Sequence, residues 1–280
     1  MRDIFDTHAH AVDLNTTSDA IVRAMDKNGV RRMCLIAPFK TLADREIAAS
    51  LPTKEKMTAT RYFYHKNARA ANEWIARIAR EQPERITPIA YVDSIAPDGP
   101  AELERAVNLG CRGLKCFNIG HYPWDERAFP LYEKAEALGL PVLFHSGAIG
   151  DARNSRFHRP AEYEILKLWP RLKVILAHLS WPWTDEAIAV AGMCAHNDPS
   201  RQMHLDLTPG APLPWREDAT RKALGYLPGH VLLFGTDNTE SGPRAAQIVA
   251  EQDAIFDKLG TSQAVRRQIY WENAIEVYGQ

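Results

Sequence analysis

The sequence predicts a (β/α)₈ barrel, in which eight parallel strands alternate with eight helices. Three observations point to this fold. Short apolar runs alternate with longer segments of helical periodicity, this strand–helix unit recurs eight times, and 280 residues suit one such barrel. An open, doubly wound parallel sheet is the structural alternative, because it is built from the same units.

The predicted strands are compact runs of aliphatic and β-branched residues. Runs of this kind are typical of parallel strands that are buried on both faces. The eight runs are Asp3–His8, Arg32–Ala37, Ile86–Val92, Gly113–Asn118, Pro141–His145, Lys173–His178, Met203–Leu207 and Val231–Gly235.

The predicted helices lie between these strands, and several have start or stop signals. Ser18 precedes an apolar-periodic run that ends at Asn28-Gly29, and Gly110 and Gly139 follow two later runs. The helices are Ser18–Asn28, Ala68–Glu81, Pro100–Leu109, Glu126–Leu138, Ala161–Leu168, Thr184–Ala195, Arg216–Leu224 and Gly242–Lys258, with a last one at Ser262–Tyr278.

One connection is much longer than the others. Residues 38–67 separate the second strand from its helix and carry the aromatic cluster Tyr62-Phe63-Tyr64-His65. Long connections in compact domains are often functional. We expect either a lid over the barrel mouth or a packed surface excursion. No repeat or linker divides the chain, so residues 1–280 are expected to form one domain.

Composition narrows the class of protein. The net charge of −1 gives no basic surface for nucleic acid or for a membrane. No apolar run approaches the roughly 20 residues of a membrane-spanning helix, and the acidic N-terminus lacks a signal-peptide pattern. A cytoplasmic location is therefore expected. The four cysteines form no C-x-x-C pair, and buried free thiols such as Cys34 and Cys116 are expected.

His8 and His10 are the first candidate metal ligands. Residues two apart in a strand point to the same face, so both imidazoles project together and can bind one cation. Such a pair alone is a weak signal.

Three further ionisable residues end apolar strands: His145, His178 and Asp237. Each alone could be an ordinary core or rim residue. In a barrel, however, the carboxyl ends of the strands meet at one mouth, where the active site lies. Histidine nitrogens and a carboxylate at this mouth predict a site for one divalent ion. Zinc is expected, with manganese or iron as alternatives.

Lys115 lies inside the fourth strand among apolar neighbours. A buried lysine needs a partner or a lowered pKa. It is expected to face the cavity, where it anchors an acidic substrate or, once carbamylated, bridges a second metal ion. The alternative is a side chain that extends to the rim.

Other residues of the predicted mouth are candidates for substrate binding. His121 and His158 follow the fourth and fifth strands, Arg153 could bind a carboxylate, and Trp181 follows His178. Each has an ordinary structural alternative, such as a surface histidine or a packing corner.

At these residues the sequence resembles the amidohydrolase superfamily, specifically its amidohydrolase-2 branch of metal-dependent barrel hydrolases and decarboxylases. The segments that carry the resemblance span the chain in the expected order. They are Phe5-Asp6-Thr7-His8-Ala9-His10, Gly113-Leu114-Lys115, Pro141-Val142-Leu143-Phe144-His145-Ser146-Gly147, Ile175-Leu176-Ala177-His178-Leu179, Leu233-Phe234-Gly235-Thr236-Asp237 and Tyr270-Trp271-Glu272-Asn273-Ala274.

The resemblance implies one metal ion bound by His8, His10, His145 and Asp237. It implies that His178 stands beside the metal as an acid, base or polarising group. A second ion would require a carbamylated Lys115, which is otherwise a substrate-side residue. A homodimer is also implied.

The leading interpretation is a hydrolase that uses a metal-activated water on a C–N or C–O bond of a small carboxylated amide, ester or lactone. Asp237 would move the proton and His178 would stabilise the carbonyl oxygen. The alternatives are a metal-dependent decarboxylase of a small aromatic or semialdehyde acid and a ligand-binding barrel without turnover.

Overall fold

The computed structural model describes residues 3–38, 50–51, 53–149, 154–197, 203–239 and 244–279, of which 53–64 are described by their backbone alone. Its sheet consists of parallel strands in the order β8-β7-β6-β5-β4-β3-β2-β1-β9. The strands are β1 Phe5–His10, β2 Arg32–Ile36, β3 Ile86–Tyr91, β4 Gly113–Cys116, β5 Pro141–Phe144, β6 Lys173–Leu176, β7 Met203–Asp206, β8 Leu232–Leu233 and β9 Asn238–Thr239.

The last strand segment closes the sheet into a barrel. β8 pairs with β7, and β9 pairs with β1. Between them, the Thr7 amide donates to the Phe234 carbonyl at 2.9 Å and the Asp237 amide donates to the His8 carbonyl at 2.7 Å. Residues 232–239 therefore bridge both edges of the sheet. This confirms the predicted barrel and rules out the open sheet.

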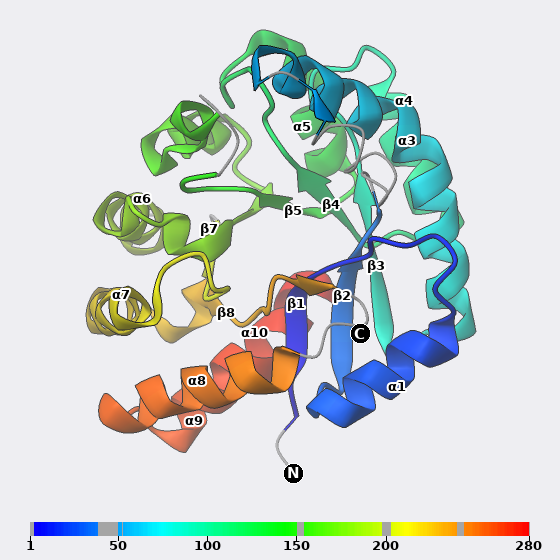
Figure 1. The fold of residues 1–280 in the computed structure, drawn as a ribbon. Coiled ribbons are helices and arrows are strands. Elements are labelled where there is room, and N and C mark those ends of the chain that lie inside the picture. Colours follow the sequence, from blue (N-terminus) through cyan, green and yellow to red (C-terminus); the bar gives the residue numbers. More distant parts are fainter. Residues whose placement is uncertain are drawn as a thin grey trace.

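The helices lie around the outside of the sheet (Figure 1). They are α1 Ser18–Asn28, α3 Thr53–Glu81, α4 Gly99–Leu109, α5 Phe129–Ala137, α6 Thr184–Asn197, α7 Leu213–Tyr226, α8 Ala245–Lys258, α9 Gln263–Arg267 and α10 Asn273–Tyr278. Short 3₁₀ segments lie between them, among them η2 Ser155–His158, η3 Pro160–Leu168 and η4 Ala177–Ser180.

Helix α1 shows why these elements form where they do. Ile21 and Met25 are one helical turn apart and are both buried against the sheet. The Thr17 hydroxyl accepts a hydrogen bond from the Ala20 amide at 3.3 Å and so caps the first turn. The helix ends at Gly29, whose φ of +71° is a left-handed conformation that favours glycine.

The prediction that residues 38–67 form one long connection was wrong for residues 53–67, which are helical. Helix α3 begins at Thr53 rather than at Ala68. The segment from Thr53 to Asn67 contains no glycine or proline and is rich in good helix formers, so the helix extends through it. The expected lid involves residues 39–49 and 52 and the side chains of Tyr62, Phe63 and Tyr64, which lie outside the described residues.

Other boundaries also differ from the predictions. Residues 160–168 form a 3₁₀ helix rather than an α-helix, beginning at a proline. The predicted strand Val231–Gly235 is regular only over β8, because the chain bends before it rejoins β1 through β9. His10 lies inside β1, whereas His145 and His178 follow β5 and β6.

Alternation along the strands separates two apolar cores. The barrel interior is filled by inward-facing residues such as Phe5, Cys34, Leu143 and Ile175, and the outer core lies between sheet and helices. Helix α10 closes the amino end of the barrel, where Tyr278 packs 6.2 Å from Phe5, centroid to centroid. The carboxyl ends of the strands carry the polar residues.

Two further expectations can be compared with the structure. Cys34 and Cys116 are free and buried, as expected, and so are Cys111 and Cys194. Among the described residues, no helix is both long enough and apolar enough to cross a membrane.

Candidate metal centre

A bulge in β1 aims His8 into the barrel. Phe5 and Asp6 pair with Arg32 and Met33, whereas Ala9 pairs with Leu35, so β1 contains one residue more than β2 over this stretch. A bulge reverses the alternation of faces beyond it. Phe5 and His8 therefore both face inward, and His8 is completely buried.

Close approach of the last strand to His8 requires Gly235. A Cβ atom built there would lie 2.8 Å from the His8 Cβ and 2.6 Å from the Thr208 Cγ2. Both distances are shorter than van der Waals contact, so a side chain at this position would push the strand away from His8.

His8, His10 and Asp237 bring three donor atoms together. The Nε2 atoms of His8 and His10 are 3.2 Å apart, and Asp237 Oδ1 lies 3.2 Å from His10 Nε2 and 3.5 Å from His8 Nε2. Ligands about 2.0–2.1 Å from a tetrahedral ion are separated by roughly 3.4 Å. The spacing therefore fits a single divalent cation.

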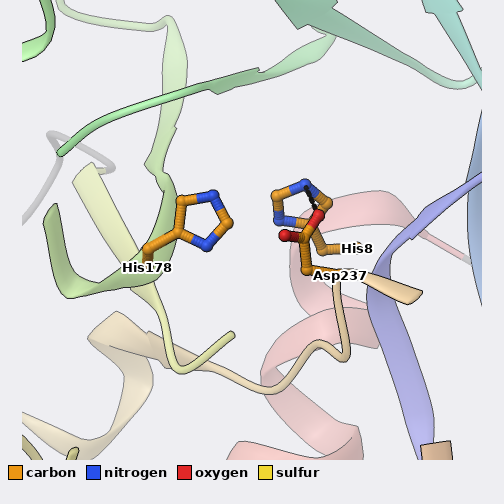
Figure 2. A group of neighbouring side chains, drawn as sticks. All are labelled: His8, His178 and Asp237. Carbon is orange, nitrogen blue, oxygen red and sulfur yellow. Dashed lines mark ion pairs between the residues drawn. The ribbon is translucent and has the colours of Figure 1, made fainter. Parts of the chain in front are cut away.

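His178 stands on the other side of this group. The ligand atoms of His8, His178 and Asp237 all lie within 4.8 Å of one another, and the three side chains surround a common space (Figure 2). His178 reaches this position from a left-handed turn, with φ values of 65°, 44° and 54° at His178, Leu179 and Ser180. Its ring centroid is 5.3 Å from that of His8.

His145 follows β5 and lies farther round the mouth. Its ring is 5.1 Å from that of His178 and 4.9 Å from that of His158, centroid to centroid. Its Nε2 is buried and has no hydrogen-bond partner among the described residues. A buried nitrogen without a partner is costly, but His145 is not among the residues whose ligand atoms lie within 4.8 Å of one another.

The protonation states suit cation binding. Burial lowers the pKa of His8 to about 3 and lowers the pKa of His10 and His145, so these rings are neutral and keep a lone pair. Burial acts to raise the pKa of Asp237, but its hydrogen bond with His10 and the nearby His8 and His178 hold it well below the usual range. The donor set therefore carries one negative charge.

Lys115 points into this centre. Its side chain is 1 % exposed, and Nζ lies 3.2 Å from His8 Nε2. Burial lowers the pKa of Lys115 to about 8. The alternative of a side chain that extends to the rim was therefore wrong, and the lysine faces the cavity as expected.

Sequence reasoning missed Asp206 and Thr208, which hold the imidazoles in place. Asp206 Oδ2 lies 2.8 Å from His8 Nδ1, and Thr208 Oγ1 lies 2.7 Å from His178 Nδ1. The pKa of Asp206 is lowered to about 2, because the nearby His8 outweighs the effect of burial. Asp206 ends β7, so the strand-end pattern that singled out Asp237 could also have found it.

Asp6 was also missed, and it ties the two edge strands together. Its Oδ1 accepts from the Thr236 amide at 2.9 Å and the His8 amide at 3.1 Å, and its Oδ2 accepts from the Thr236 hydroxyl at 2.6 Å. Burial raises the pKa of Asp6 to about 7. The carboxyl group fixes the turn that presents Asp237.

Comparison with known proteins gives the family. A family model described as amidohydrolase matches residues 5–280. The chain is a member of the amidohydrolase-2 family. The motif-based resemblance is thereby confirmed, and the match covers all the residues described above. No curated protein sequence shows a significant match to this amidohydrolase.

Solved structures with the same fold include enzymes of two kinds. A 2,6-dihydroxybenzoate decarboxylase has a TM-score of 0.64 at 17% identity over 100% of both chains. A probable 2-pyrone-4,6-dicarboxylic acid hydrolase from Acinetobacter baumannii has 0.63 at 15% identity over 99% of both chains. A 5-carboxyvanillate decarboxylase from Novosphingobium aromaticivorans, complexed with manganese, has 0.65 at 12% identity over 100% of this chain and 96% of its own. At such identities the similarity establishes the fold.

The predicted substrate-binding residues of this amidohydrolase lie in different surroundings. His121 is buried, with Nε2 2.8 Å from the Ser94 hydroxyl, and His158 is buried behind His145. Trp181 is partly buried and lines a surface groove of about 600 Å³ together with Trp215. Arg153 lies outside the described residues.

Proposed function

We propose that this amidohydrolase is a metal-dependent hydrolase that cleaves a C–N or C–O bond of a small carboxylated amide, ester or lactone. One observation carries the proposal. The Nε2 atoms of His8 and His10 and Oδ1 of Asp237 lie 3.2–3.5 Å from one another at the carboxyl ends of the strands. This is where active sites of the fold lie.

His8, His10 and Asp237 would hold the ion, with His145 as a further ligand. Zinc fits a set of imidazoles and one carboxylate, as do manganese and iron. A divalent ion supplies Lewis acidity, which can bring the pKa of water down to about 7. A second ion would require carbamylation of Lys115.

Asp237 is the proposed general base. Its carboxylate is ionised and 34% exposed, so it is accessible from the mouth. It would take the proton from the attacking water and deliver it to the leaving nitrogen or oxygen of the substrate. This requires one carboxylate oxygen to stay available for the proton.

Lys115 is the proposed partner of the substrate carboxylate. Its ammonium group donates a hydrogen bond to the lone pair of His8 Nε2. A cation bound by His8 would occupy the same lone pair. With the lone pair occupied, the ammonium needs another acceptor. An acidic substrate in the mouth would provide one.

Decarboxylation of a small aromatic or semialdehyde acid is the second candidate. Both reactions occur among the structurally similar proteins described above, which include two decarboxylases and a probable hydrolase. The same donor set could orient a carboxylate substrate. Release of carbon dioxide from a panel of carboxylic acids would favour this candidate over hydrolysis.

The test is the Asp237→Asn variant, assayed on panels of lactones, amides and esters that carry a carboxylate. We expect hydrolysis by the zinc-loaded wild type and a loss of at least about a hundredfold in kcat in the variant. Asp218→Asn, on the surface of α7, is the matched control and should keep wild-type turnover. Normal turnover by metal-loaded Asp237→Asn would contradict the proposed role.

A further inference from the structure

Asp206 contacts three residues beside the candidate metal centre, which are His8, His178 and Thr208. It is completely buried, and its Oδ2 contacts His8 Nδ1 at 2.8 Å. Its Oδ1 accepts from two backbone amides, that of His178 at 2.6 Å and that of Thr208 at 3.2 Å. The Thr208 hydroxyl also contacts Oδ1. Oδ1 of Asp206 therefore has three hydrogen-bond partners, and Oδ2 has His8 Nδ1.

The direction of each hydrogen bond follows from the backbone amides. An amide N–H can only donate, so Oδ1 of Asp206 is an acceptor. The Thr208 hydroxyl that contacts this oxygen must therefore donate its only hydrogen to it. That hydrogen is then unavailable to His178. Across the 2.7 Å contact between Thr208 Oγ1 and His178 Nδ1, the proton must lie on the nitrogen.

His8 Nδ1 also carries its proton. Oδ2 belongs to a carboxylate whose other oxygen accepts three hydrogen bonds, so it too accepts, and His8 Nδ1 donates. A neutral imidazole has one N–H. When such a ring is neutral, its other nitrogen, Nε2, carries a lone pair. The Nε2 of His8 faces His10 Nε2 at 3.2 Å.

We propose that Asp206 and Thr208 are positioning residues that hold His8 and His178 in one tautomer, with the proton on Nδ1 and the Nε2 lone pair available to the centre. Asp206 acts on His8 directly and on His178 through the Thr208 hydroxyl. One carboxylate thus sets the tautomer of two rings from different strands.

The consequence concerns the role of His178 and rests on the proposed function. A neutral His178 in this tautomer accepts a proton or binds a cation through Nε2. It cannot donate a hydrogen bond from Nε2 to a carbonyl oxygen, in contrast to the role expected from the sequence. The tautomers themselves are independent of the reaction that the centre performs.

The test is ¹⁵N NMR of histidine-labelled protein, which distinguishes protonated from unprotonated ring nitrogens. His178→Gln and His8→Gln variants identify the signals of the two rings. In the wild type, as purified and after one equivalent of Zn²⁺, we expect protonated Nδ1 and unprotonated Nε2 for both. A wild-type His178 with its proton on Nε2 would overturn the proposal, whatever substrates the enzyme hydrolyses.

Three variants test the relay. In metal-free Thr208→Val, which lacks the hydroxyl, the Nδ1–H to Nε2–H ratio of His178 should fall about tenfold, the equivalent of one hydrogen bond. Thr208→Ser should restore the wild-type ratio. Thr220→Val, at an equally buried threonine of α7, should leave it unchanged. An unchanged His178 ratio in folded Thr208→Val would overturn the assignment of Thr208.

Discussion

The two sides of the barrel mouth support their histidines in different ways. On the side of β1, β6 and β7, His8 and His178 are held through their ring nitrogens by Asp206 and Thr208. On the side of β4 and β5, the Nε2 atoms of His145 and His158 have no hydrogen-bond partner among the described residues. Both rings pack against Phe117, at centroid distances of 4.9 and 5.2 Å, and His158 is also held through Nδ1, which lies 3.2 Å from the His145 carbonyl oxygen.

The difference shows which part of the centre is formed before anything binds. Hydrogen-bonded ligands keep their orientation, whereas a buried nitrogen without a partner gains stability when a ligand supplies one. The side that carries Asp206 therefore provides a preorganised half of the centre. The side that carries His145 has buried nitrogens without a partner among the described residues, which a bound ion or substrate would satisfy.

Replacing Asp206 should have the largest effect on stability. In Asp206→Asn, the side-chain NH₂ group would face at least one group that now donates a hydrogen bond to the carboxylate. Both donors would then lack an acceptor, and buried groups would be left unsatisfied. We expect a loss of about 3 kcal/mol in the free energy of unfolding, measured by urea denaturation. His158→Gln, on the other side, should cost about 1 kcal/mol. Equal losses in the two variants would contradict the comparison.

A second buried group of β7, His204, should make stability depend on pH. His204 lies two residues before Asp206 and is buried, and its Nε2 has no hydrogen-bond partner in the part of the chain that the structure describes. Burial lowers its pKa from 6.5 to about 4. Between these values the unfolded chain binds the proton more readily, so stability is lost as the pH falls from 6.5 to 4.

This loss amounts to roughly 3 kcal/mol at most. His204→Gln removes the titrating group. The difference in unfolding free energy between wild type and variant should therefore change by about that amount between pH 7 and pH 4. Parallel pH curves for the two proteins would show that the buried His204 does not contribute.

A smaller loss of stability is expected when a methyl group is added at Gly210, next to His178. A Cβ atom at Gly210 would lie 2.6 Å from the His178 Cβ, whereas one at Gly225 of α7 would meet nothing within 4 Å. Gly210→Ala should lower the unfolding free energy by about 1–3 kcal/mol. Gly225→Ala, the matched control, should raise it by about 0.5–1 kcal/mol. A tolerated Gly210→Ala would indicate that His178 is not tightly held.

The sequence predicts the barrel and the location of the centre because both follow from periodicity. Apolar strand patterns give the order of the strands, and His8, His10 and Asp237 are recognisable as polar residues at or near strand ends. Asp206 was overlooked since Leu207 seemed to continue its strand, although alternation from His204 places it on the inner face.

Other features depend on tertiary contacts that no local pattern encodes. The extra residue in β1, which turns both Phe5 and His8 inward, follows from pairing with β2. The left-handed turn at His178 is held by Asp206 and Thr208 from the neighbouring strand. The start of α3 was missed because a long connection was expected where helix-forming residues continue without a break.

The most direct test of the account is Zn²⁺ binding, measured by calorimetry together with elemental analysis of the protein. We expect one tightly bound divalent ion per wild-type chain and a loss of affinity of at least about a hundredfold in His10→Gln. His158→Gln, on the other side of the mouth, should bind almost as well as the wild type. A wild type that binds no divalent ion, or a His10→Gln variant with unchanged affinity, would contradict the assignment of the metal centre.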